Sequence, residues 1–265
     1  MNQTMFLLTN SGIDAPLSFW AGATQAAPAQ QSDNINIALA KELKNGYNLS
    51  VDAYFKQIKN INFTKEDPGV VTIDADWQKN LEIGKSHGYG LEMMIQKSTG
   101  YLTGWLSYTL AFANQKYDNI NLGKAFEFSY NRRNTVNLVM NYRLSESNSI
   151  FMSLTLASGR RFTIPGGKYL DIDGNSILDY RTLNNYKGPF FQRLDLGCIF
   201  VRSHYSNADD HQLYLTLFNA LLAKNPINIY TDYVPSGSGS GTGSYKVYST
   251  SAPFFIPGIT YILKF

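Results

Sequence analysis

The stretch "LTGWLSYTLAF", residues 102–112, decides the fold class. Leu106, Tyr108 and Leu110 lie on one side of an extended chain, while Ser107 and Thr109 lie on the other. This alternation has the period of two that is typical of a β-strand with one apolar face. Its length matches the ~9–11 residues with which a tilted strand crosses a bilayer. The stretch therefore predicts a strand with one face in an apolar environment and the other near water.

The same alternation recurs along the whole chain and predicts about ten strands. They lie within residues 4–10, 34–43, 47–56, 89–96, 102–112, 136–144, 150–156, 193–200, 212–218 and 253–265. The residues on the apolar side are expected to face lipid. Central members of this set are Leu49, Val51, Leu91, Met93, Leu106, Leu110, Leu138, Met140, Leu154, Leu196, Leu215 and Leu263.

Short and long connections alternate between the predicted strands. The short turns are residues 44–46, 98–100, 145–148 and 206–210, and the long loops are roughly 11–33, 62–86, 117–134, 160–191 and 222–252. Asn45-Gly46 is a strong signal for a type I′ hairpin. Short turns at one rim and long loops at the other are typical of an outer-membrane β-barrel. A soluble β-sandwich also has many alternating strands, but it explains neither the connection lengths nor the strand lengths.

Composition supports a barrel and argues against several other classes. Aromatic residues make up 14% of the chain and charged residues only 16%, yet mean hydropathy is −0.22. No apolar run approaches the ~18 residues of a membrane-spanning helix, whereas a barrel strand needs only one apolar face. The net charge of +3 is too small to indicate a nucleic-acid partner. The single Cys198 excludes an internal disulfide and is expected to be a small apolar strand residue.

The polar faces of the strands and the start of the chain both suggest part of a larger barrel. The polar faces are mostly Asn, Ser, Thr, Gly, Ala, Asp and Arg, whereas side chains can largely fill the narrow lumen of a closed small barrel. Small polar residues favour an arc of a wider barrel. The opening "MNQTMFLLTN" lacks the basic and apolar regions of a signal peptide. We therefore expect either a reading frame that begins late or a piece of a longer protein.

Taken in order, several stretches resemble the C-terminal β-barrel portion of TonB-dependent outer-membrane transporters. They are "NGYNLSVDAYFKQIKNI" (45–61), "GYGLEMMIQKSTGYLTGWLSYTLAFA" (88–113), "NRRNTVNLVMNYRLS" (131–145), "SGRRFTIPGG" (158–167), "RLDLG" (193–197), "LFNALLAKNP" (217–226) and "FIPGITYILKF" (255–265). The resemblance implies that residues 1–265 are the last part of a 22-stranded barrel. It also implies that the signal peptide, plug domain, TonB box and first twelve strands are absent.

The family also supplies an interpretation of the aromatic C-terminus. In this family the last strand ends on an aromatic residue, which the barrel-assembly machinery is thought to read. The resemblance therefore implies that Tyr261, Leu263 and Phe265 form an assembly signal. It further implies that outer-membrane lipid is a partner and that the TonB complex is reached only through the missing N-terminal parts.

Aromatic and basic residues in the long loops could together line a ligand vestibule. A basic patch would suit an anionic small molecule such as a ferric chelate, although any single residue has an ordinary reading as a membrane-interface anchor or a loop-packing residue. The candidate ligand-binding residues are Trp20, Tyr130, Arg132, Arg133, Arg161, Tyr180 and Arg181; neighbouring loop residues of the same kind are Phe19, Phe126, Phe128, Tyr169, Tyr186 and Arg160.

Three other motifs have simpler readings. Asp209-Asp210-His211 resembles the acidic pair and His of ten-stranded outer-membrane proteases. It is predicted in a short turn on the periplasmic rim, however, whereas the active sites of those proteases face outward. "DIDGNSILD" (171–179) resembles a Ca²⁺ loop, yet its Gly is displaced and the closing Glu is absent. "SGSGSGTGS" (236–244) is a flexible low-complexity loop rather than a phosphate cradle. We accordingly expect no catalytic residues, metal site or cofactor.

Together, the residues predict an all-β transmembrane barrel segment, and the resemblance implies its function. The implied function is TonB-dependent import of a scarce nutrient, such as a metal chelate, across the outer membrane of a Gram-negative cell. Two alternatives stay open, namely a complete ten-stranded outer-membrane enzyme and a structural or adhesive barrel.

Overall fold

The computed structural model describes residues 5–9, 18–64, 77–170, 172–173, 176–203, 210–235, 243–251 and 254–264. Within these ranges the chain is all-β, apart from the short 3₁₀ turns η1 (Lys44–Gly46), η2 (Trp77–Asn80) and η3 (Asn121–Gly123). No helix in this part of the chain is long and apolar enough to cross a membrane. The prediction of an all-β protein is confirmed.

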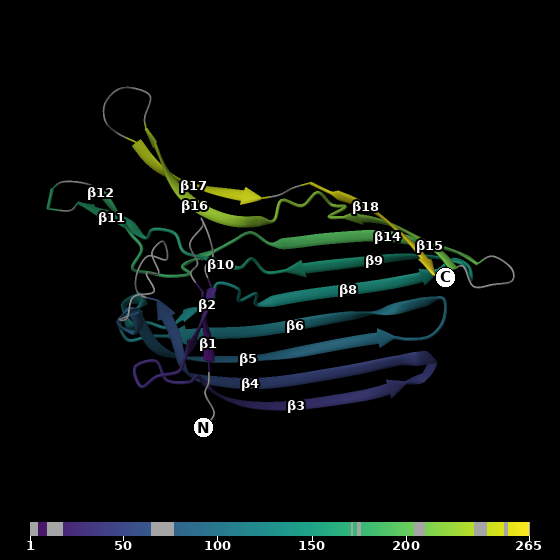
Figure 1. Cartoon of the computed structure of the whole chain (residues 1–265), viewed down its shortest axis with the longest axis horizontal. Helices are drawn as coiled ribbons and strands as arrows, with labels where there is room; N and C mark the ends of the chain where they lie inside the picture. Colours follow the sequence, from purple (N-terminus) through teal and green to yellow (C-terminus); the bar gives the residue numbers. More distant parts are fainter. Residues whose placement is uncertain are drawn as a thin grey trace.

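One large antiparallel sheet dominates the molecule (Figure 1). Its path is β18-β15-β14-β9-β8-β6-β5-β4-β3, and the two-residue β7 (Phe126–Glu127) pairs with β6 beside this path. Each strand of this path therefore pairs with the next strand of the path along the chain, as expected for a barrel wall. The strands of the path are β3 (Gln31–Leu43), β4 (Tyr47–Thr64), β5 (Leu81–Lys97), β6 (Leu102–Lys116), β8 (Asn134–Arg143), β9 (Asn148–Ala157), β14 (Phe191–Ser203), β15 (Asp210–Phe218) and β18 (Ile256–Lys264).

The strand register collects the apolar residues on one face. Leu106 lies opposite Leu138 on one side and Ile95 on the other, and Leu138 lies in turn opposite Leu154. Directly opposed residues point to the same face of a sheet, so these side chains form a continuous apolar row. The polar partners form the other face: Tyr54, for example, lies opposite Gly90.

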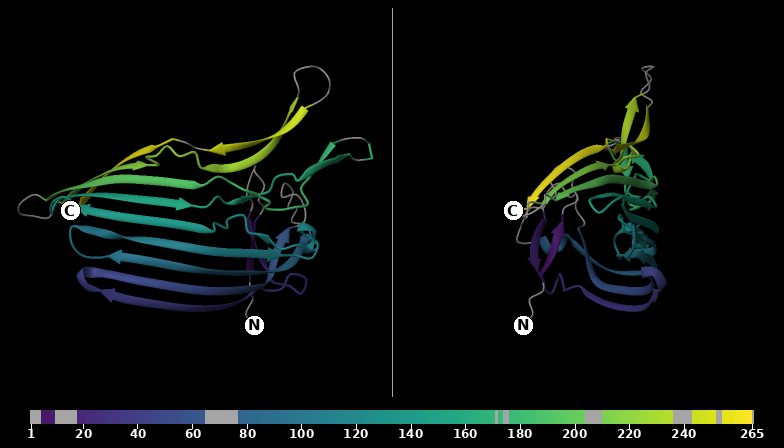
Figure 2. Two further views of the ribbon diagram at one scale, coloured as in Figure 1. Left: turned by 180° about the vertical axis from the view of Figure 1, so that it is seen from behind. Right: turned by 90° about the vertical axis from the view of Figure 1, so that its right-hand side faces the viewer.

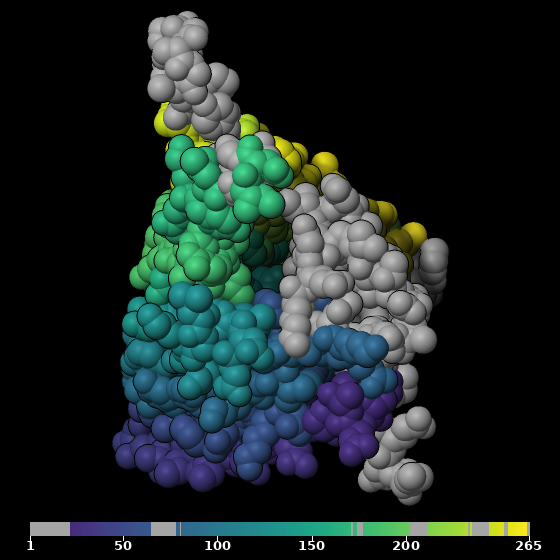
Figure 3. All heavy atoms as spheres, turned by 90° about the vertical axis from the view of Figure 1, so that its left-hand side faces the viewer, coloured from purple at the N-terminus to yellow at the C-terminus, as the bar shows by residue number. Residues whose placement is uncertain are grey.

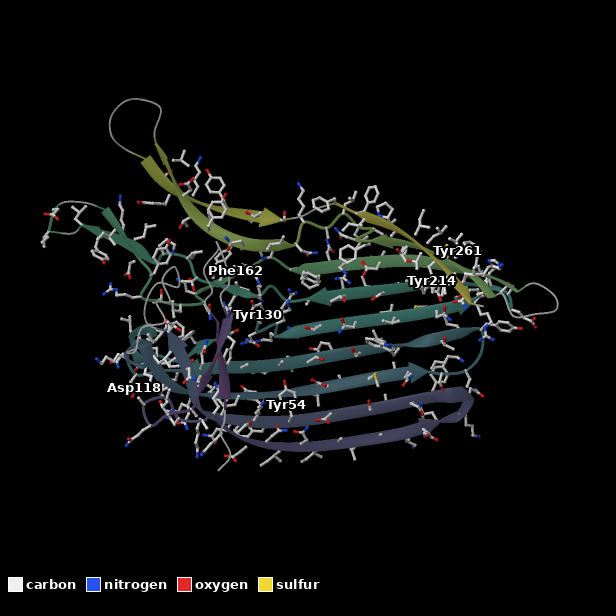
Figure 4. All side chains as sticks on the ribbon, viewed as in Figure 1. Tyr54, Asp118, Tyr130, Phe162, Tyr214 and Tyr261 are labelled. Atoms are coloured by element: carbon white, nitrogen blue, oxygen red, sulfur yellow. The ribbon has the colours of Figure 1, made fainter. Side chains whose placement is uncertain are left out.

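The sheet is curved and its two edges are open. The right-hand view of Figure 2 shows an arc, and Tyr54 and Tyr214 lie on its concave side in Figure 4. The polar face is thus concave and the apolar face convex, as in a barrel wall. Among the described residues no pairing joins β3 to β18, so the sheet does not close on itself.

The connections separate into two rims, as the sequence predicts. The turn at Asn45 and Gly46 has φ angles of 62° and 74°, which are the two positive φ values of a type I′ turn. The turns between β5 and β6 and between β8 and β9 lie at the same rim in Figure 1, and the long loops extend from the opposite rim. Residues 204–209 lie outside the described ranges.

The opening segment does not join the wall, and that prediction was wrong. β1 (Met5–Thr9) pairs with β2 (Ser18–Gly22) in a separate two-stranded sheet on the concave side (Figures 1 and 2). Residues 4–10 were predicted as the first wall strand from their apolar run. A short apolar run indicates a strand but does not specify which strand it pairs with. The first strand of the wall is instead β3. The two-residue β7 also belongs to the sheet, so a tally of ten strands does not confirm the predicted set.

Further hairpins project from the loop rim. β16 (Pro226–Pro235) pairs with β17 (Gly243–Ser251), β11 (Gly167–Leu170) pairs with β12 (Ser176–Asp179), and β10 (Arg161–Phe162) pairs with β13 (Tyr186–Lys187). The first two extend well beyond the sheet in Figure 1. The predicted loop 222–252 is therefore largely an ordered hairpin, although residues 236–242 of its Gly/Ser tip lie outside the described ranges.

The buried apolar residues gather at the loop rim, not between two sheets. Ile61, Tyr117 and Phe126 form a cluster against which Phe63 and Leu183 pack. Wall residues such as Leu39, by contrast, are exposed, at 72% of the side chain's maximum. A β-sandwich buries the inner faces of two sheets against each other. The position of the core therefore argues against the sandwich alternative.

Gly104 in β6 permits a close approach between strands and should not tolerate a side chain. Its φ of +146° is rarely adopted by other residues, and a Cβ there would overlap the carbonyl oxygen of Val139 and lie 2.9 Å from Cα of Met140. We expect Gly104→Ala to destabilise the protein by roughly 1–3 kcal/mol, measured by urea unfolding in detergent micelles. Gly167→Ala is the matched control, since a Cβ there has no neighbour within 4 Å. Equal stability of the two variants would contradict this register.

Candidate functional site

Four of the seven predicted ligand-binding residues lie together at the loop rim. Tyr130, Arg132 and Arg133 belong to the segment that enters β8, and Arg161 begins β10. Figure 4 shows Tyr130 and Phe162 at the loop end of the central strands, and Figure 3 looks onto this end. We call the residues 126–133 and 158–162 the rim cluster.

Glu127 in β7 holds the rim cluster together. Arg161 donates from Nε to Oε2 at 3.1 Å and from Nη2 to Oε1 at 2.7 Å. Arg133 reaches Oε1 at 3.2 Å, and Asn131 donates to Oε2 at 2.8 Å. A carboxylate that accepts a two-pronged contact from one guanidinium and further bonds from two neighbours is a strong local anchor. Arg161 and Arg133 thus share one ion-pair partner within the protein.

The electrostatics of Glu127 follow from these contacts. The hydrogen bonds from Arg161, with the bond from Asn131 and the positive charges of Arg161 and Arg133, hold the pKa of Glu127 below its ordinary value of 4.5. Partial burial acts in the opposite direction and does not outweigh them. The same pairing raises the pKa of Arg161. The ion pairs are therefore present at neutral pH.

Backbone contacts extend the cluster to the segment that follows β12. The side-chain amide of Asn184 donates to the backbone oxygen of Glu127 at 2.7 Å, and the backbone N–H of Arg161 donates to the oxygen of Ser129 at 2.9 Å. The backbone N–H of Leu183 donates to Oδ1 of Asn121 at 2.8 Å. Three loop segments distant in sequence are thereby tied to one another, which gives this rim a defined shape.

Removing the carboxylate of Glu127 should loosen these loops in a pH-dependent manner. Because the pKa is lowered on folding, the stabilisation is full above about 4.5 and is lost as the pH falls through the folded-state pKa. We expect Glu127→Gln to reduce amide protection of residues 126–133 and 183–185 at pH 7 by the equivalent of about 1–3 kcal/mol. The measurement is hydrogen–deuterium exchange, with wild type and variant compared at each pH.

The matched control is Glu146→Gln, which removes an exposed carboxylate from a turn at the opposite rim. The difference between wild type and Glu127→Gln should shrink below pH 4.5. A difference that persisted unchanged into acid would show that the charge of Glu127 is not what holds the loops.

Arg132 and Arg160 lie beside this anchor and contact aromatic rings. The guanidinium of Arg132 lies 4.3 Å from the ring centre of Phe191. That of Arg160 lies 4.4 Å from the ring of Phe162 and 5.8 Å from that of Tyr130. Such cation–π contacts use the flat face of the guanidinium. Arg160 also donates to the backbone oxygen of Ile227, which connects the cluster to β16.

The other predicted site residues lie elsewhere. Arg181 is paired with Asp179 at 2.7 Å, and the hydrogen bonds from Arg181 lower the pKa of that partly exposed carboxyl to about 2. The hydroxyl of Tyr180 lies 3.4 Å from that of Thr231 in β16. The backbone of Trp20 lies opposite Leu7 in the β1–β2 hairpin, and its side chain lies outside the description. The structure therefore brings together Tyr130, Arg132, Arg133 and Arg161, but not the whole predicted set.

Comparison with known proteins shows which solved structure this fold resembles. No protein-family model and no curated protein sequence matches the chain. A solved structure that does match is the ferripyoverdine receptor of the outer membrane of Pseudomonas aeruginosa, with ferripyoverdine bound. The TM-score is 0.50 at 12% sequence identity, and the match covers 82% of this chain and 26% of the receptor.

The chain has the fold of part of an outer-membrane receptor's wall. The resemblance to the barrel portion of TonB-dependent transporters is thus confirmed as a resemblance of fold. The chain spans about a quarter of the receptor's length. In this chain the rim cluster lies at the rim from which the long loops extend (Figure 1).

The last strand of this receptor-like wall is β18. Tyr261 lies opposite Leu213 and Leu263 lies opposite His211, so both are in register with β15. The hydroxyl of Tyr261 contacts Nδ1 of His211. Phe265, the third residue of the predicted assembly signal, lies outside the described residues.

The Asp-Asp-His triplet and the Ca²⁺-like loop form no recognisable site among the described residues. His211 and Asp210 belong to β15, while Asp209 lies outside the described ranges. Asp171 and Asn175 of the Ca²⁺-like loop also lie outside them. Among the described residues, no group of three or more His, Cys, Asp or Glu side chains could hold a metal ion.

Sequence reasoning missed the residues that organise the rim cluster. Glu127 and Asn184 were not singled out, because single polar residues in long loops carry no periodic signal. Arg160 was noted only as a neighbour of Arg161, yet its contacts differ from those of Arg161. The only local signal was the density of Arg and aromatic residues in 126–133 and 160–162, which correctly indicated the region but not the pairing.

Proposed function

We propose that the chain is wall and loops of a TonB-dependent outer-membrane receptor that imports a small molecule into a Gram-negative cell. The small molecule is a scarce nutrient such as a metal chelate. The observation that carries the proposal is the open, curved antiparallel sheet, apolar on its convex face and polar on its concave face, with the fold of a receptor wall. Apolar outside and polar inside is the arrangement of a water-filled barrel in a membrane.

The open edges support the proposal that further strands complete the barrel. In hydrocarbon each unpaired backbone group costs several kcal/mol, so barrels that cross membranes are closed. The edge strand β3 presents Ile35, Ile37 and Leu39 at 65%, 67% and 72% exposure. We propose that a longer protein contains further wall strands before residue 31. The last of these strands pairs with β3, and the first pairs with β18, so that the barrel closes.

The concave face supports the proposal of a polar partner inside the barrel. Asp52 in β4 lies directly opposite Glu92 in β5, and Oδ1 of Asp52 is buried without a hydrogen-bond partner among the described residues. Like charges that face each other across strands are destabilising, and buried polar groups are normally hydrogen-bonded. A plug domain that carries donors to this wall would satisfy both residues.

The proposed mechanism divides the work between this chain and the missing parts. The loops, with the plug, bind the ligand from outside, and the rim cluster is the part of the loops that we assign to this task. The TonB complex then acts on the plug to open a path along the polar concave face. Lipid contacts the convex face, and the barrel-assembly machinery reads Tyr261, Leu263 and Phe265 at the end of the last strand.

Energy-coupled uptake by the complete gene product tests the proposal. The product is expressed in a Gram-negative host that lacks its own iron receptors, and radioactive iron is supplied as citrate, catecholate and hydroxamate chelates. We expect uptake of at least one chelate that disappears when TonB is deleted or the proton gradient is collapsed. A Leu263→Asp variant, which should assemble poorly, is the control. Its uptake should fall in proportion to the amount of protein that reaches the outer membrane.

Two results would argue for the alternatives. A product that folds in the outer membrane but binds none of the chelates would favour a structural barrel. Hydrolysis of added peptides or lipids, lost on replacement of His211, would favour an enzyme.

A further inference from the structure

Positive charge in the rim cluster exceeds what its carboxylate can neutralise. Arg132, Arg133, Arg160 and Arg161 surround the single Glu127, and Arg133 and Arg161 are bonded to it. Arg132 and Arg160 form no ion pair with any carboxylate among the described residues; their contacts are aromatic rings and one backbone oxygen. The two unpaired guanidinium groups are thus distinguishable from the two that serve the loop anchor.

Holding these two cations together is electrostatically unfavourable. Arg160 lies 5.8 Å from the ring of Tyr130, two residues before Arg132. Its backbone oxygen accepts from the N–H of Gly188, three residues before the Phe191 ring that Arg132 contacts. Consistent with this arrangement, partial burial and then the charge of Arg160 lower the pKa of Arg132. Nε of Arg160 is buried and has no hydrogen-bond partner among the described residues, so this guanidinium can reach a ligand only through its Nη groups. Like charges near a protein surface repel one another unless an anion lies between them. The pair is therefore better suited to an occupied state than to an empty one.

The aromatic rings leave the right donors available. A ring that covers the flat face of a guanidinium leaves the N–H groups at its edge, which lie in the plane of the group, for a ligand. Phe191 lies on the concave side, because it alternates with the convex-face residue Leu194 along β14. Arg132 therefore reaches toward the barrel interior, away from the lipid side. Tyr130 is 79% exposed, and its ring offers an apolar surface beside Arg160.

We propose that Arg132 and Arg160 form a subsite for the carboxylate of a small aromatic molecule. The carboxylate accepts hydrogen bonds from the edges of both guanidinium groups, and the aromatic part stacks on Tyr130. This inference rests on the proposed function, since it names the ligand chemistry of the receptor's loops. An occupant from the lipid phase is disfavoured by the concave position of Phe191.

Equilibrium binding to the purified complete gene product in neutral detergent tests the subsite. The probes are naphthoate, an aromatic carboxylate, and naphthamide, its neutral analogue, followed by naphthyl fluorescence. We expect naphthoate to bind at least about tenfold more tightly than naphthamide, because a charged group gains charge-assisted hydrogen bonds. Arg132→Gln with Arg160→Gln should weaken naphthoate binding about tenfold or more and leave naphthamide binding unchanged.

The matched control is Arg181→Gln, since Asp179 already neutralises that exposed guanidinium. It should change naphthoate affinity less than about twofold. Equal affinity for the two probes, or an equal effect of the control and the double variant, would overturn the proposal. If the double variant does not fold, the single variants Arg132→Lys and Arg160→Lys replace it, because each preserves the charge and removes the planar fork. Each should weaken naphthoate binding severalfold. Unaltered naphthoate affinity in both variants would also overturn the proposal.

Binding and uptake can fail separately, which keeps the two proposals distinct. Naphthoate binding that is lost in the double variant supports the subsite even if no chelate is imported. TonB-dependent uptake of any chelate supports the receptor function, whereas naphthoate binding that survives in the double variant overturns the subsite.

Discussion

Leu106→Arg should destabilise the folded wall by ~2–4 kcal/mol, the cost of placing Arg on the lipid face of a barrel near the middle of the bilayer. Leu106 is central in its row, opposite Leu138 and Ile95, and 43% of its side chain is exposed on the convex face. The arginine would remove an apolar contact with lipid and place a charge where water cannot reach it. The free energy of unfolding of the complete gene product in lipid vesicles, measured by urea titration, gives the effect.

Ser107→Arg is the matched control, one residue further along β6. Its side chain lies on the concave face with Asn137 as its partner in β8, where water or polar side chains can solvate a charge. We expect a much smaller cost there. Equal tolerance of the two variants in a folded protein would mean that the convex face is not a lipid face.

Residues 1–265 expressed alone behind a signal peptide should not yield a compact, heat-modifiable barrel. The wall ends in two open edges, the 13-residue β3 and the 9-residue β18. Neither edge can remain unpaired in hydrocarbon, because each orphaned N–H or C=O costs several kcal/mol. The expected effect is loss of the folded state, which is the largest that we predict.

Direct pairing of β3 with β18 would satisfy both edges by closing a small barrel. The residues on the concave face argue against this closure. Closure would crowd the inward Tyr54, Trp105, Arg143 and Tyr214 into a narrow lumen. The facing carboxylates of Asp52 and Glu92 would be enclosed there as well, and enclosed charges need partners. The β1–β2 hairpin also occupies the concave side.

Heat-modifiability on gels and TonB-dependent uptake measure the outcome. The control is the complete gene product expressed from the same signal peptide. A lone 1–265 chain that ran as a compact barrel and imported ligand only in the presence of TonB would show that this wall needs no further strands.

The strands were predictable from the sequence because one physical cause sets both pattern and fold. A strand between water and an apolar phase must alternate, so Leu106, Leu138 and Leu154 could be assigned to one face before their neighbours were known. The turn at Asn45-Gly46 was equally local, since few residue pairs adopt two positive φ angles at low cost. Prediction failed at residues 4–10, where a short apolar run carries no information about its partner.

The rim cluster was predictable as a region but not as a site. The density of arginines and aromatic rings in 126–133 and 160–162 indicated where polar contacts would form. Which arginine meets Glu127 depends on the pairing of β7 with β6 and on the position of Asn184, more than 50 residues away. Two adjacent arginines, Arg160 and Arg161, consequently have different roles that no local pattern distinguishes.

The sequence by itself determined the strands, their apolar and polar faces, the order of short turns and long loops, and the one-sidedness of the wall. These properties depend on residues two apart in the chain, so local alternation specifies them. Only the tertiary structure decided that the β1–β2 hairpin leaves the wall, that the sheet stays open between β3 and β18, and that Glu127 forms ion pairs with Arg133 and Arg161 but not with Arg132 and Arg160. Those outcomes depend on contacts between segments far apart in sequence, where the free energy of pairing belongs to both partners and neither segment encodes it alone.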